Sequence, residues 1–145
     1  MTQALCTSFK VEMLTAQHNF AASGGHTFKV ALAKAGVVLN ADTTNYSALG
    51  IYEVGNTGTY SAGGFILTRV DPSASGTTAM VTFSGNPQWT GVTIADCTQA
   101  LIYNSSQSNK AVAVLDFGGN QAVTAGTFTI NWPSATATTA LLRFI

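Results

Sequence analysis

Residues 100–117, ALIYNSSQSNKAVAVLDF, decide the fold of this chain. The stretch holds two short apolar runs, residues 100–103 and 111–115, which are separated by a polar break of Asn, Ser and Gln. The second run contains no charged side chain before Asp116, which is typical of a central strand covered on both faces. Apolar runs of this length between turn-forming residues predict β-strands.

Short runs of β-forming residues, bounded by Gly, Asn, Ser and Pro, recur along the rest of the chain. Over residues 26–33 apolar and polar side chains alternate, with Phe28, Val30 and Leu32 on one face, which predicts a half-buried strand. The other predicted strands are residues 50–54, 65–70, 78–83, 88–94, 127–132 and 140–145, with a bulge at Gly91 and turns at residues 59–64 and 118–121.

These eight or nine short strands, at regular spacing and without a long helical pattern between them, predict an all-β protein. The expected fold class is an antiparallel, jelly-roll-like β-sandwich that forms a single domain, residues 1–145. A helix fits the pattern at two places only. Ser8 is a candidate cap for a short N-terminal helix, and residues 42–49 fit a single turn.

Charged residues make up only 8% of the chain, six basic and six acidic, against a usual share of roughly a quarter. Because binding to a phosphate backbone takes a clustered basic face, this scattered neutral set excludes nucleic acid as an expected partner. The two charge-free stretches, residues 72–95 and 117–142, are rich in Thr, Ser, Gly and Asn, so no membrane span is expected. The N-terminal residues lack the features of a signal peptide, so secretion by that route is not expected.

Residues with catalytic or metal-binding chemistry are few and scattered. His18 and His26 lie outside any metal-binding motif, the six acidic residues stand alone, and no nucleophile motif is present. Cys6 and Cys97 lie too far apart for a paired-cysteine motif and are expected to be reduced, packed thiols. The sequence therefore predicts no catalytic residue, no metal site and no cofactor.

Trp89 and Trp132 leave two interpretations open. Each ring fits either a platform on which a sugar ring stacks, as in carbohydrate-binding modules, or the core of the sandwich. The core is favoured for Trp132, which alternates with Thr and Asn, and is favoured less strongly for Trp89, which lies beside a turn.

Several short phrases follow one another in order along the chain. They are residues 8–10 (SFK), 18–20 (HNF), 26–32 (HTFKVAL), 57–64 (TGTYSAGG), 100–104 (ALIYN), 110–119 (KAVAVLDFGG), 126–130 (GTFTI) and 140–143 (ALLR). Taken in this order, the phrases resemble a family of small virion proteins of tailed bacteriophages. The resemblance covers nearly the whole chain, although residues 59–64 read TYSAGG where the family's turn reads GYTAGG.

The resemblance implies a capsid decoration, or cement, protein with a jelly-roll fold and no catalytic residues. Such proteins bind the outside of a shell built from an HK97-like major capsid protein, commonly as dimers. The expected partners are therefore the major capsid protein and further copies of this chain, and the expected location is the virion surface after synthesis in the host cytoplasm. A tail-fibre or receptor-binding module, or another carbohydrate-binding sandwich, is the alternative.

The low charge also bears on assembly. A free soluble monomer usually uses surface charge to prevent edge-to-edge association, and this chain has little of it. Its surface is therefore suited to being covered by neighbours in an assembly. The candidate assembly contacts are Met1, Thr2, Gln3, Ala4, Leu5, Tyr60 and Trp89.

Overall fold

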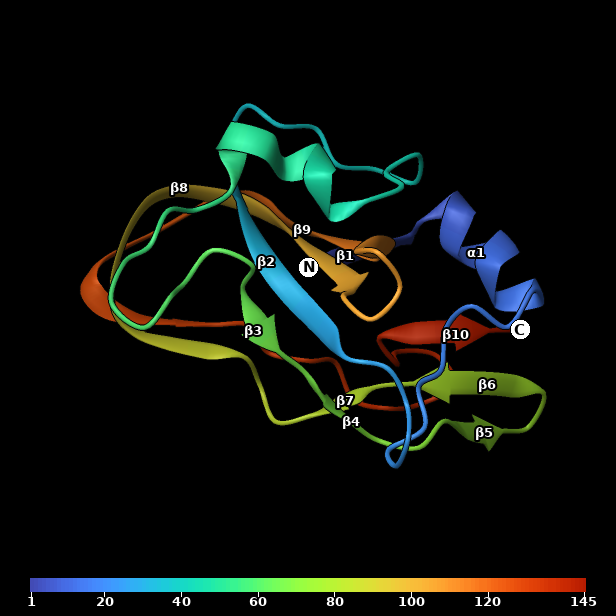
Figure 1. The fold of residues 1–145 in the computed structure, drawn as a ribbon. Coiled ribbons are helices and arrows are strands. Elements are labelled where there is room, and N and C mark those ends of the chain that lie inside the picture. The colour runs from blue at the N-terminus through green and yellow to red at the C-terminus, as the bar shows by residue number, and fades with distance from the viewer.

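The computed structural model describes residues 1–145 and consists mainly of antiparallel β-structure (Figure 1). It has ten strands and two short helices, neither of which is long and apolar enough to span a lipid bilayer. The predicted fold class, an all-β antiparallel sandwich, is confirmed, with ten strands in place of eight or nine. The elements are β1 (Thr2–Leu5), α1 (Thr7–Leu14), β2 (Phe28–Lys34), the 3-10 helix η1 (Tyr46–Tyr52), β3 (Phe65–Ile66), β4 (Thr68–Arg69), β5 (Ser73–Ser75), β6 (Thr78–Val81), β7 (Phe83–Ser84), β8 (Gln88–Asn104), β9 (Lys110–Thr129) and β10 (Leu142–Phe144).

A single long hairpin, formed by β8 and β9, organises the other strands. The two strands pair from Asn104 and Lys110, beside the connecting turn, to Gln88 and Thr129 at the far end. The register shifts repeatedly in the middle of this pair, and Figure 1 shows both strands curving back together on the left of the view. Because irregular pairing increases the bend and twist of a ribbon, one hairpin can contribute to both layers of the sandwich.

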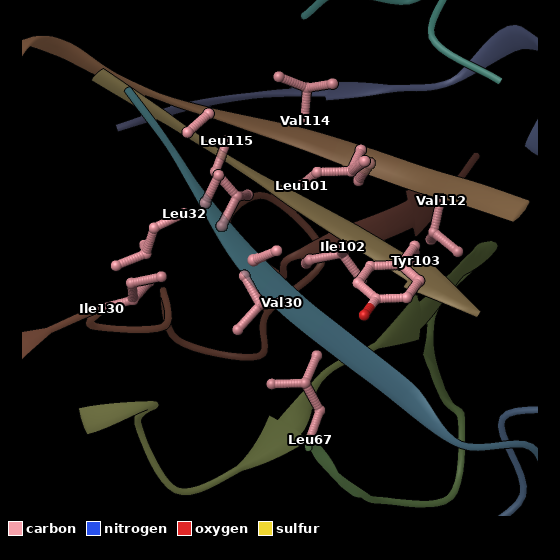
Figure 2. Close-up of a cluster of buried hydrophobic side chains, with 14 of the residues drawn as sticks. Val30, Leu32, Leu67, Leu101, Ile102, Tyr103, Val112, Val114, Leu115 and Ile130 are labelled. Atoms are coloured by element: carbon pink, nitrogen blue, oxygen red, sulfur yellow. The ribbon is translucent and has the colours of Figure 1, made fainter. Parts of the chain in front are cut away.

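Around the hairpin the strands form three sheets. The largest has the strand order β1-β9-β8-β2-β3, and the smaller ones have the orders β10-β6-β5 and β4-β7. Between the layers, apolar side chains of β2, β8 and β9 pack with Leu67 and Ile130 in one continuous cluster (Figure 2). Burying each such Leu or Ile side chain stabilises the fold by roughly 1.5–3 kcal/mol, so this cluster is the main source of stability.

Residues 111–115 are all buried, as predicted for a central strand covered on both faces. One face of this strand belongs to the core, and the segment that carries η1 lies over the neighbouring part of the sheet (Figure 1). The Leu39 N–H donates to the side chain of Gln99, and the ring of Tyr46 stacks on that of Tyr103 with centroids 4.6 Å apart.

The structure confirms the predicted bulge and corrects two other predicted elements, a turn and a strand. Gly91 has a φ of +62° at a register shift, so the predicted bulge is confirmed. The turn predicted at residues 118–121 is wrong, because these residues lie inside β9 where it bends beside β8. The strand predicted at residues 50–54 is also wrong, because its first half belongs to η1, which Asn45 caps by accepting a hydrogen bond from the Ser47 N–H at 3.0 Å.

The predicted N-terminal helix is α1, but Ser8 does not cap it. The helix begins at Thr7, so Cys6 takes the cap position without a side-chain hydrogen bond, and Ser8 lies in the first turn. Phe9 is fully buried on the inner face of α1, where its ring lies 4.9 Å from the ring of His18. Packing of Phe9, rather than a cap, therefore holds this short helix in place.

Candidate interaction surface

The predicted N-terminal contact residues form the edge strand β1, which pairs with β9 on one side only. Met1, Thr2 and Gln3 are exposed, whereas Ala4 and Leu5 are half-buried. These five residues are therefore accessible in part or in full. Their predicted role as assembly contacts remains a prediction.

The outer edge of β1 carries unpaired backbone groups. The Cys6 N–H donates to the Val112 carbonyl at 3.0 Å, which determines which residues of β1 face β9. Because residues that bond to the neighbouring strand alternate with residues that do not, Gln3 and Leu5 direct their N–H and C=O groups away from β9. A further strand would bind to these groups.

β1 lacks the features that usually keep an edge strand from pairing with another chain. Such strands commonly carry lysine, proline, an inward-pointing charge or a bulge. Residues 1–5 contain no charged side chain and no proline, and their register with β9 is regular. The edge therefore suits the addition of a strand from a partner.

The C-terminal segment lies beside this edge. β1 and residues 140–145 line a shared hollow of about 140 Å³, and β1 and residues between 131 and 143 line a second hollow of about 340 Å³. β10 pairs only with β6, so its other edge is unpaired as well. Residues 1–5 and 133–145 are together called the terminal surface below.

Hydroxyl groups, rather than charges, dominate the polar part of the terminal surface. The Thr139 hydroxyl donates to the Ser134 carbonyl at 2.6 Å and lies 2.7 Å from the hydroxyl of Thr136, so these contacts order the segment before β10. Arg143 is the only charged side chain in residues 1–5 and 133–145, and Ile145 is 96% exposed. A partner can therefore cover this surface while desolvating few full charges.

Tyr60 and Trp89 are buried, so the prediction that they contact a partner is wrong. Trp89 is only 2% exposed, and its ring packs against those of Tyr60, Phe65 and Phe128 at centroid distances of 5.4, 5.8 and 6.1 Å. A ring enclosed on all of these sides belongs to the core and does not offer a free face to a sugar. The interpretation of Trp89 as a stacking platform is therefore also wrong.

The polar groups beside Tyr60 are used inside the fold. The Glu53 carboxylate accepts hydrogen bonds from the hydroxyls of Tyr46 and Tyr60 and from the Gly63 N–H, the last at 2.6 Å. The Tyr103 hydroxyl donates to the Gly63 carbonyl at 2.6 Å. Burial raises the pKa of Tyr60, and burial together with the Glu53 carboxylate raises the pKa of Tyr103 to about 12. The cluster therefore fixes the glycine-rich turn against the sheet.

His18 and His26 are joined to other polar side chains rather than to a nucleophile. The side-chain partners of His18 are Glu12 and Asn104, and those of His26 are Asn104 and Gln107. No group of three or more His, Cys, Asp or Glu side chains is placed to hold a metal ion. The two histidines connect α1 and the segment before β2 to the turn between β8 and β9.

Cys6 and Cys97 are free and buried, as predicted. Burial, followed by the nearby Glu12 carboxylate, raises the pKa of Cys6 to about 11, and burial raises the pKa of Cys97 to about 12. Both thiols therefore stay protonated at neutral pH, which makes them poor nucleophiles.

The terminal surface is the part of the molecule that most resembles a docking site. It combines an unprotected strand edge, a second unpaired edge and a nearly uncharged lining. Comparison of the chain with protein-family models, with curated proteins and with solved structures finds no match.

Proposed function

We propose that this protein is a capsid decoration protein that binds the outer surface of a tailed-phage shell. The observation that carries the proposal is the open edge of β1, which has no charged side chain and lies beside the C-terminal segment that contains β10. The ordered sequence phrases that resemble such proteins support it independently. The partner is the major capsid protein, and the bound form is a dimer or higher oligomer of this chain.

Binding at this edge would use strand addition. An extended segment of the capsid protein would pair with the outward N–H and C=O groups of Gln3 and Leu5, and main-chain hydrogen bonds of this kind supply much of the affinity. The hollows beside β1 would take the side chains of the added strand. Because the surface is hydroxyl-rich and Arg143 is its one charged side chain, its polar groups can be paired across the interface while few full charges are desolvated.

Such a protein works through binding energy alone. A ligand that binds only the assembled shell stabilises it by mass action, by about 2.7 kcal/mol per site at a concentration one hundred times the Kd. A copy that touches two capsomers also gains from multivalent attachment, because the second contact forms within an already tethered complex. No catalytic residue, metal or cofactor takes part in this function.

The direct test of the binding edge is Gln3→Pro. Proline removes the outward N–H of Gln3 and crowds an incoming strand, but it leaves the hydrogen bonds from β1 to β9 in place. Losing one hydrogen bond and its close packing amounts to about 1.4 kcal/mol, so occupancy on purified capsids should fall roughly tenfold. Occupancy is measured by titrating capsids that lack the protein and sedimenting them.

The matched control is Ile66→Pro at the opposite edge of the same sheet. The Leu67 N–H donates to the Phe28 carbonyl, so the Ile66 N–H points away from β2, and its side chain is 62% exposed. This variant should bind capsids like the unchanged protein. Equal occupancy of the Gln3→Pro and Ile66→Pro variants would contradict the assignment of β1 as the binding edge.

A further inference from the structure

Asn104, at the end of β8, lies fully buried between two histidine rings. Its Nδ2 is 3.0 Å from Nδ1 of His18 and 3.0 Å from Nδ1 of His26. Its Oδ1 accepts a hydrogen bond from the Ser106 N–H at 3.0 Å. The backbone donor at Ser106 fixes the orientation of the amide, so the amide nitrogen of Asn104 faces both rings.

This arrangement determines the protonation of both histidines. An amide nitrogen only donates, so Nδ1 of His18 and Nδ1 of His26 both act as acceptors and carry no proton. The Nδ1 of His26 is also approached by the Asn19 N–H at 3.3 Å. On its other side, His18 donates from Nε2 to Glu12 at 2.7 Å. His18 is therefore a neutral ring with its proton on Nε2.

Three titratable or charged groups face His18 from the elements packed around it. They are Glu12 of α1, His26 of the segment before β2, and Lys110 of β9, whose Nζ lies 3.3 Å from the other oxygen of Glu12. Burial lowers the pKa of His18 from its ordinary value of 6.5. Glu12 acts against this shift, while His26 and Lys110 add to it. Burial and the hydrogen bond from Asn104 therefore both favour the neutral form of the His18 ring.

We propose that Asn104, His18 and His26 form an acid-sensitive latch that holds α1 and residues 15–27 against the β8–β9 hairpin. Protonation of His18 at Nδ1 turns an acceptor into a donor and places two donors 3.0 Å apart. Turning the amide of Asn104 does not relieve this conflict, because it would set the amide nitrogen against the Ser106 N–H. Acidification therefore opens the contact.

The sign of the pH dependence follows from the lowered pKa of His18. The folded protein binds this proton less readily than the unfolded chain does, so the stabilising contribution of the latch is complete above about pH 6.5. It is lost progressively as the pH falls from that value toward the lower pKa of the folded state. The loss is local, because the rest of the core contains no other buried histidine.

Cys6 gives a local readout, because it is fully buried where β1 meets α1. In a Cys97→Ala variant, Cys6 is the only thiol, and in a Cys6→Ala variant only Cys97 in β8 remains. Labelling with dithiodipyridine, which reacts at acid pH, is measured on native and on denatured protein at the same pH. The ratio of the two rates gives the protection of each thiol.

Between about pH 7.5 and about pH 5.5, protection of Cys6 should fall by up to roughly tenfold, while protection of Cys97 should change much less. In a His18→Asn, His26→Asn double variant the carbonyl oxygens can still accept from Asn104 but do not titrate, so the fall at Cys6 should disappear. The single His18→Asn variant should abolish it if the double variant does not fold. Constant protection of Cys6 in the parent protein, or an equal fall at both thiols, would overturn the proposal.

Discussion

Replacing Trp89 with alanine is expected to lower the free energy of unfolding by about 3–5 kcal/mol. The ring is 2% exposed and is packed against Tyr60, Phe65 and Phe128. Its removal would leave a cavity between β8, β9 and the glycine-rich turn, which the surrounding strands can fill only in part. Denaturant unfolding, followed by far-UV circular dichroism, measures the loss.

Trp132→Ala is the matched control for this variant. Trp132 is half-buried, and its closest aromatic neighbour is Phe83, with centroids 6.1 Å apart. Its replacement should cost clearly less than the replacement of Trp89, because less apolar surface leaves the core. A loss of less than about 1 kcal/mol for Trp89→Ala would show that its ring is not enclosed, since exposed positions have effects of that size.

Gly64→Ala should have the second largest effect, a loss of about 3 kcal/mol. Gly64 has a φ of +82°, and a Cβ at this position would lie 1.9 Å from the carbonyl oxygen of Val30 in β2. An alanine therefore has a disfavoured backbone conformation and must also push β3 away from β2. The same denaturant unfolding measures this loss. The m value, which is the slope of the unfolding free energy against denaturant concentration, should stay constant if the native fold is kept.

Gly63→Ala separates these two costs. Gly63 has a φ of +98°, but the nearest atoms to a Cβ there, on Tyr103 and Lys29, lie at 3.6 and 3.9 Å, which is ordinary contact. This variant should lose only the cost of the backbone conformation, about 1–2 kcal/mol. If both variants lose the same amount, the close approach of Gly64 to β2 does not contribute to stability.

Much of the sheet could be predicted from the sequence. Residues 100–103 and 111–115 are strands because short apolar runs between polar turns leave few alternatives, and residues 26–33 show the alternation of a strand directly. The bend of the central hairpin was not predicted. Glycines at residues 118 and 119 signal a turn locally, but they lie within β9 at a register shift, between Asp116 and Gln121, which pair with Gln99 and Cys97 of β8.

The misplacement of Trp89 has a specific cause. Residues 88–94 show no clean alternation of apolar and polar side chains, so the sequence could not show on which face of the sheet the Trp89 ring lies. The bulge at Gly91 shifts the alternation of side chains between the two faces of the strand by one residue. As a result, the side chains of Trp89, Val92 and Ile94 are all buried. Local sequence can predict a bulge, but it cannot predict the side to which the strand turns after it.

The polar clusters lay beyond the reach of local patterns. Asn104 and His18 are 86 residues apart, and only the packing of α1 and the segment after it against the β8–β9 hairpin brings them together. The accessible edge of β1 is a different case. Its residues were predicted as contacts, but residues 1–5 have no strand-forming pattern, and only pairing with β9 makes them a strand.

The proposed role as a decoration protein is tested most directly by the copy number of this protein in purified phage particles. Gel densitometry, or quantitative mass spectrometry, compares it with the major capsid protein in the same particles. A decoration protein covers the whole shell, so a copy number of the same order as that of the major capsid protein is expected. A few copies per particle, as expected for a tail tip, or none at all, would contradict it.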